Sequence, residues 1–160
     1  MRQRVINKIK VPALLLALWS VLACGGTICH EYIALGGVWG SCDTLLFACN
    51  GCEAETLALS VGVRHSADYP YKDLWIEVEG MSRDSIVHRD TVCCSIFGDD
   101  GRINGTTAGM LYQSEFFVSE LPTPLNGLRV RHIMSDSMLR GVHDVGIRLV
   151  LPGRHQYEGR

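Results

Sequence analysis

The sequence lacks an apolar run long enough to span a membrane. Its longest mainly apolar stretch covers residues 11–23, which is 13 residues, whereas a spanning helix needs about 20. Residues 1–10 contain four basic residues and no acidic one. A positively charged start followed by a short apolar run is typical of a secretory signal. The N-terminus therefore predicts export and excludes a transmembrane helix at this point.

The end of the apolar run resembles the lipobox of bacterial lipoproteins, because residues 21–24 read Val-Leu-Ala-Cys. An aliphatic residue, a permissive position and a small residue precede the cysteine that receives the lipid, and Leu22 is a less usual choice for the permissive position. We expect residues 1–23 to be a cleaved signal peptide. Cys24 would then carry diacylglycerol and acyl chains, and several chains on one cysteine anchor a protein stably. An ordinary signal peptide that ends by chance at a cysteine is the alternative.

A basic excess is also absent. The formal charge is 15 − 17 = −2 for the whole chain and 11 − 17 = −6 once the four cations of the signal are removed. No basic patch stands out, which argues against nucleic acid as a partner and against electrostatic adsorption to anionic lipid. The remaining 160 − 23 = 137 residues suit one domain with a modest core, and neither a repeat nor a low-complexity tract divides them.

The alternation of apolar and polar residues predicts an all-β domain. Apolar residues occupy every second position in residues 57–63, 74–78 and 145–151, which is the period of a half-buried strand. Turn signals such as Gly-Asp-Asp-Gly at residues 98–101 separate the predicted strands. We therefore expect an antiparallel β-sandwich or jelly roll. Its strands are predicted at residues 44–48, 56–63, 74–78, 90–97, 116–121, 128–134 and 142–151.

The rest of the chain completes this outline. A short helical piece is predicted only at residues 135–140, and a loop at residues 98–113. We expect a lipidated tether over residues 24–38, the sandwich domain over residues 39–152 and a C-terminal tail over residues 153–160.

Signatures of catalysis are missing from the sequence. There is no G-x-S-x-G elbow. Cys49 and Cys52 would need a second ligand pair to hold zinc, and the adjacent Cys93 and Cys94 are a poor one because they point to opposite faces of a strand. A redox pair would open a helix, which the sequence does not predict here. We expect no catalytic residue, no metal and no cofactor besides the lipid on Cys24.

A purely structural role for Cys49 and Cys52 also has a physical basis. The Asn-Gly between them is the strongest short hairpin signal, and it places the two cysteines opposite each other across a turn. They would form a cross-strand disulfide or two packed thiols. A metal or redox protein centred on this pair is the least favoured alternative for the function.

Four aromatic residues are candidates for a ligand-binding platform. Trp39, Tyr69, Tyr71 and Trp75 would stack on sugar rings if their side chains faced solvent together. The alternation in residues 74–78 places Trp75 on the face opposite the apolar side chains. Core or edge-capping positions are the default for such aromatics. If these side chains are exposed together instead, the protein would be a glycan-binding jelly-roll module of the cell envelope, which is the main alternative function.

Two stretches carry short motifs that composition does not explain. Residues 61–78 contain Arg64, then Tyr69-Pro70-Tyr71, with Trp75 four residues later. Residues 132–149 contain Asp144-Val145-Gly146 in the last predicted strand. In this order, and together with the lipobox, the two stretches resemble the gliding-motility lipoprotein H family of Bacteroidetes.

The resemblance runs from about the lipid cysteine to residue 150, and the Asp-Val-Gly ending after Tyr-Pro-Tyr is its most specific part. The chain departs from the family pattern in the loop at residues 103–110, at His132, where a glutamine is common, and in its extra cysteines.

The motif residues are expected to form scaffold or interaction surface. Pro70 would fix the start of an edge strand, and Gly146 would let another backbone approach closely. Arg64 and Asp144 would form an ion pair across the sheet.

The resemblance implies a non-enzymatic envelope lipoprotein that the cell needs for movement over surfaces, in machinery that works alongside the type IX secretion apparatus. Its partners would be a membrane, through the lipid, and other envelope proteins of the motility or secretion apparatus. Relatives also occur in bacteria that do not glide, so a general envelope role is a further alternative.

Two smaller expectations depend on the same resemblance. Gly25, Gly26 and Thr27 lack the acidic cluster with which such bacteria export lipoproteins to the outer surface, so we expect Cys24 to hold the domain on the periplasmic side. The sequence Asp-Ser-Ile at residues 84–86 matches the Asp-Ser/Thr-hydrophobic pattern of O-glycosylation in this phylum. Ser85 is therefore the candidate for that modification.

Overall fold

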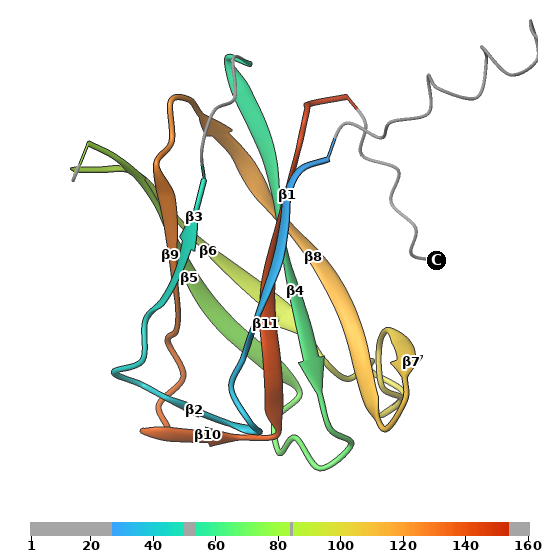
Figure 1. Ribbon diagram of the computed structural model, residues 1–160. Coiled ribbons are helices and arrows are strands. Elements are labelled where there is room, and N and C mark those ends of the chain that lie inside the picture. Colours follow the sequence, from blue (N-terminus) through green and yellow to red (C-terminus); the bar gives the residue numbers. More distant parts are fainter. Residues whose placement is uncertain (1–26, 50–53, 84, 154–160) are drawn as a thin grey trace, which may run out of the picture.

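The computed structural model describes residues 27–49, 54–83 and 85–153, and Figure 1 shows their arrangement. Cys24, the predicted signal peptide and Cys52 lie outside these residues. The described part contains eleven strands and no helix. The strands are β1 Thr27–Ala34, β2 Val38–Gly40, β3 Leu45–Ala48, β4 Thr56–His65, β5 Asp73–Ser82, β6 Ser85–Ser95, β7 Thr106–Ala108, β8 Leu111–Pro122, β9 Gly127–His132, β10 Met138–Arg140 and β11 Val142–Val150.

Two antiparallel sheets form the two layers of the domain. One has five strands in the order β1-β11-β4-β8-β7, and the other has four in the order β3-β9-β5-β6. The side chains between them are fully or almost fully buried, as for Phe47 on β3, Leu59 on β4, Ile76 on β5, Val130 on β9 and Ile147 on β11. The predicted all-β antiparallel sandwich is therefore confirmed.

A two-stranded ribbon, β10 with β2, crosses one end of the sandwich (Figure 1). Trp39 of this ribbon is fully buried, and its ring meets that of His132 edge to face at 5.2 Å between centroids. Strand β1 begins at the other end of the molecule (Figure 1). The ribbon thus closes the end of the core that lies away from Thr27.

Three local expectations are wrong. Residues 27–34, placed in the tether, form strand β1, which pairs with β11 along its length. All residues of this edge strand are exposed or half-buried, so it shows no clear alternation. A helix was expected at residues 135–140, but the structure has strand β10 there. This strand was missed because its pairing partner β2 is remote in sequence. The loop expected at 98–113 contains the three-residue strand β7 and the start of β8.

The edge strand β1 is held by one tyrosine that lies over two glycines. Tyr32 is the register partner of Gly146 on β11, which in turn pairs with Gly62 on β4. A Cβ at Gly146 would lie 2.6 Å from Tyr32 Cγ and 2.7 Å from the carbonyl oxygen of Glu31, and a Cβ at Gly62 would overlap the Tyr32 hydroxyl. The two glycines therefore leave the space in which the ring lies, and the close approach predicted at Gly146 is confirmed.

Replacing Gly62 with alanine tests this arrangement, because the three nearest atoms to its Cβ all belong to Tyr32. We expect Gly62→Ala to lower the free energy of unfolding by about 1–3 kcal/mol, the cost of overpacking. In a Tyr32→Ala background, the same change should instead stabilise by about 0.5–1 kcal/mol, since alanine is preferred to glycine in a strand. Urea unfolding followed by circular dichroism measures both values, and equal costs in the two backgrounds would contradict the account.

Candidate functional site

The outer face of the four-stranded sheet carries a regular array of charged side chains. Alternation along β5 turns Glu77 and Glu79 away from the core, while Ile76 and Val78 are buried. The antiparallel register then aligns residues in rows across the strands, because directly opposed residues share a face. One row reads Leu46, Arg129, Glu79 and Arg89 from β3 to β6, and the next reads Arg131, Glu77 and Thr91 from β9 to β6.

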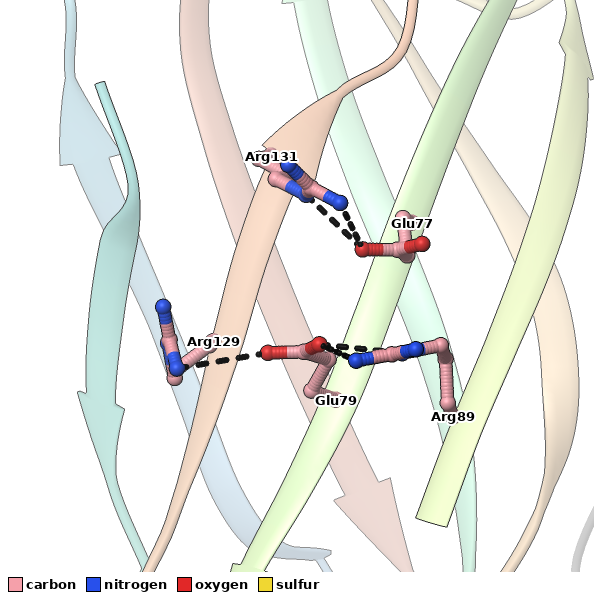
Figure 2. Close-up of polar contacts among 5 residues, drawn as sticks. All are labelled: Glu77, Glu79, Arg89, Arg129 and Arg131. Carbon is pink, nitrogen blue, oxygen red and sulfur yellow. Dashed lines mark hydrogen bonds and ion pairs between the residues drawn. The ribbon is translucent and has the colours of Figure 1, made fainter. Parts of the chain in front are cut away.

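Three arginines and two glutamates of these rows form two ion-paired groups (Figure 2). Arg89 donates to Glu79 Oε1 through Nε at 3.0 Å and through Nη2 at 2.6 Å. Arg129 Nη1 lies 3.5 Å from the other oxygen of Glu79. Arg131 contacts Glu77 Oε1 through Nε at 2.8 Å and through Nη2 at 2.7 Å. We call these five residues the arginine–glutamate array.

The array presents its positive groups outward. The Glu79 side chain is 9% exposed, while that of its partner Arg89 is 57% exposed. The hydrogen bond and the charge of Glu79 raise the pKa of Arg89. The carboxylates thus lie beneath the guanidinium groups and stabilise them, so that an approaching molecule meets arginine first.

Exposed apolar side chains border the array. Trp75, two residues before Glu77 on the same face of β5, is 45% exposed. Ile133, which follows β9, donates its backbone N–H to the carbonyl of Trp75, and its side chain is also exposed. Leu46 on β3 is exposed next to Arg129. Trp and Arg, the residue types enriched at protein interfaces, thus lie together on this face with exposed aliphatic side chains.

The four aromatic candidates do not form one platform. Trp39 and Tyr69 are buried, and the Tyr69 hydroxyl donates to the carbonyl of Asp73. Tyr71 is half-buried against the core, and its hydroxyl donates to Asp136 Oδ2 at 2.5 Å. The predicted exposure of Trp75 on the face opposite the core is confirmed, but it stands there without the other three.

Pro70 does not start an edge strand, which corrects the expectation. It is exposed in the connection between β4 and β5, and β5 is an interior strand between β9 and β6. With Tyr69 and Tyr71 it lines an open hollow of about 390 Å³, which residues 97–99 and 101 also line. The rim carries the exposed Lys72–Asp99 ion pair at 2.5 Å, a kind of contact that contributes little to stability.

Arg64, Asp144 and Gly146 meet at Tyr32, on the outer face of the five-stranded sheet. Arg64 and Asp144 are cross-strand neighbours, as expected, but among the contacts of the described residues no ion pair joins them. The Arg64 guanidinium instead lies 4.3 Å from the centroid of the Tyr32 ring, and its Nε donates to Gln113 Oε1 at 2.8 Å. Burial raises the pKa of Tyr32, and the charge of Arg64 opposes that rise. These motif residues therefore hold strand β1 in place.

The cysteine and serine candidates are placed as follows. Cys49 is buried, and burial raises the pKa of its thiol to about 12; its expected partner Cys52 lies outside the described residues. Ser85 is exposed at the start of β6, so its O-glycosylation stays a prediction that mass spectrometry of the intact protein tests.

Within the described ranges, no group of three or more potential metal ligands is present. Nor does this part of the chain contain a helix with the length and hydrophobicity needed to cross a membrane.

Sequence reasoning missed the array as a unit. The signal that could have found it is the placement of charge at alternate positions, in Arg129-Val130-Arg131 on one strand and Glu77-Val78-Glu79 on another. Opposite charges spaced by two on neighbouring strands pair directly when the strands are antiparallel. Which strands are neighbours was not evident, because β5 and β9 are about 50 residues apart and their pairing is non-local.

The fold and this surface define a β-sandwich protein with a charged, partly apolar outer sheet face. The chain belongs to the GldH lipoprotein family, since the family model matches residues 27–149, which is most of the chain. Searches of curated proteins and of solved structures gave no match. The family resemblance expected from the sequence is thereby confirmed, and the protein is a gliding-motility lipoprotein by family.

Glu79 holds together the larger of the two ion-paired groups, since it contacts two arginines while nearly buried. We expect Glu79→Gln to lower the free energy of unfolding by about 1–3 kcal/mol, because charge-assisted hydrogen bonds lose a charged acceptor in a desolvated position. Asp99→Asn, which breaks the fully exposed pair with Lys72, should leave stability unchanged within error. Thermal and urea unfolding of both variants measure the change in the free energy of unfolding. Equal changes in the two variants would count against a structural role for Glu79.

Proposed function

We propose that this protein is a lipid-anchored component of the cell envelope that acts through protein contacts and not through catalysis. Cys24 would carry the lipid and hold the domain on the periplasmic side of its membrane. The domain would serve the motility or secretion-associated machinery as a scaffold or interaction component. The observation that carries the proposal is the outer face of the four-stranded sheet, where Trp75, Ile133 and Leu46 border the arginine–glutamate array.

Chain length limits how the domain stands on its anchor. Only residues 25 and 26 separate Cys24 from strand β1. Three Cα–Cα steps span at most about 11 Å, so the end of the sandwich at Thr27 would face the bilayer. The array lies on strands β5, β6 and β9, along a side of the sandwich (Figures 1 and 2), and Trp75 is on β5 as well. A neighbouring envelope protein would therefore reach this face from the side, without the bilayer covering it.

The alternatives lose support from the geometry. A glycan platform would need several exposed aromatic rings, and Trp39 and Tyr69 are in the core. A redox role for Cys49 would need a thiolate, and a thiol whose pKa is raised to about 12 by burial is protonated at neutral pH. Protein contact is the function that the exposed side chains favour.

Removal of the anchor tests the proposal. We expect the double variant Val21→Ala, Cys24→Ala to be exported, because Ala-Leu-Ala at residues 21–23 supplies an ordinary cleavage site, and then released in soluble form. The native chain should incorporate labelled palmitate and sediment with membranes. In a deletion strain, the native chain should restore colony spreading and the soluble variant should not, at equal abundance. A variant that stays in the membrane fraction after a carbonate wash would refute lipid anchoring at Cys24.

A further inference from the structure

We propose that the outer face of the four-stranded sheet binds an acidic segment of a partner protein, with Arg129 as the residue that receives its carboxylate and Trp75 as the apolar contact. This inference rests on the proposed function and names the chemistry of the partner. It depends on the geometry of the array, on the distribution of charge over the chain and on the apolar border.

The array is a positive site on an acidic protein. It contains three arginines and two glutamates, a net charge of 3 − 2 = +1. The rest of the expected mature chain carries eight cations and fifteen acids, which is 8 − 15 = −7. Asp73 lies on the same face but beyond Trp75, beside Lys72. Complementary potentials favour an acidic partner at the array and repel one from most of the remaining surface.

Arg129 has more unused N–H donors than the other two arginines of the array. Arg89 and Arg131 each direct two nitrogens at one glutamate oxygen. Among the described residues, Arg129 makes a single contact, from Nη1 to Glu79 at 3.5 Å, and its side chain is 40% exposed. A guanidinium offers five N–H donors in a planar fork that matches a carboxylate in bidentate geometry. An incoming Asp or Glu would therefore find its partner here without breaking an existing pair.

The apolar side chains that border the array indicate how long the ligand is and what chemical groups it carries. Leu46 is directly opposite Arg129, and Ile133 and Trp75 lie at the other end of the array. A segment that covers both ends would cross the strands and contact apolar groups on both sides of its carboxylates. A net charge of +1 is too small for non-specific attraction of a polyanion such as nucleic acid, whose affinity grows with the number of cations that contact phosphate. An acidic polypeptide, folded or extended, fits both the apolar side chains at the two ends of the array and its small positive charge.

Photo-crosslinking from Leu46 tests the inference in the full-length lipoprotein, expressed in its own cells. A benzophenone amino acid replaces Leu46, which is exposed beside Arg129. After irradiation, mass spectrometry identifies the crosslinked peptide. We expect a peptide with a run of Asp or Glu near the crosslink, and a yield that falls about tenfold with Arg129→Gln, the factor that 1.4 kcal/mol represents.

Arg148 provides a matched control on the other sheet. Its side chain is 42% exposed, and within the described part of the chain it makes one contact, from Nη1 to Glu115 at 3.3 Å. Arg148→Gln should leave the crosslinking yield unchanged. Reversing the charge of the identified acidic residues should abolish the crosslink with native Arg129 and restore it with Arg129→Glu.

The outcomes separate this inference from the proposed function. A crosslinked peptide without acidic residues, or a yield that Arg129→Gln leaves unchanged, overturns the acidic-partner inference while a protein contact remains. Crosslinks to lipid or glycan alone, or no crosslink from a correctly folded and membrane-bound chain, also overturn it. Failure of the anchor is detected independently, by the fractionation of the variant that lacks Cys24.

Discussion

The structure depends on the way in which Tyr32 attaches the first strand to the sandwich. Strand β1 is an edge strand, with one neighbour only, and it is also the strand nearest to the predicted lipid on Cys24. Any force on the anchor would reach the domain through β1. The ring of Tyr32 lies over Gly146 and Gly62, with Arg64 on its outer face at 4.3 Å. One side chain thus spans two neighbouring strands and adds side-chain packing to the backbone ladder of β1.

This arrangement explains why the family motifs do not gather at one site. Arg64 and Gly146 serve the packing of β1, and Tyr69 lies in the core, whereas Trp75 is exposed on the opposite sheet. The sandwich therefore separates its two tasks. In the proposed function, the five-stranded sheet would connect the domain to its anchor, and the four-stranded sheet would present Trp75 and the arginine–glutamate array to a partner.

Much of the fold was predictable from local pattern, and the reasons for the failures are physical. Alternation identified β5 and β11 and the outward direction of Trp75, because those strands have a fully buried face. It failed for β1, which is half-exposed on both sides, and for β10, which is a strand only because β2 lies beside it. It also gave β4 one buried face, although Ala58 and Ser60 on the other face are buried too, as expected for an interior strand between β11 and β8.

The site was less predictable than the fold. Trp75 was identified as a candidate, but its partners Arg129 and Arg131 come from a strand whose position in the sheet only the structure reveals. The expected ion pair between Arg64 and Asp144 failed for a related reason. Their register was right, yet Tyr32, from a third strand, offers the guanidinium an aromatic face. Alternation within a single strand cannot predict a side-chain contact to which three strands contribute.

The central claim is that the outer face of the four-stranded sheet performs the function. Colony spreading by a deletion strain that carries Trp75→Ala tests it most directly, with Met138→Ala as the control, because Met138 is an apolar residue on the ribbon that is more exposed than Trp75. The account predicts that Trp75→Ala abolishes spreading at normal abundance and membrane attachment, and that Met138→Ala spreads normally. Normal spreading with Trp75→Ala would contradict it.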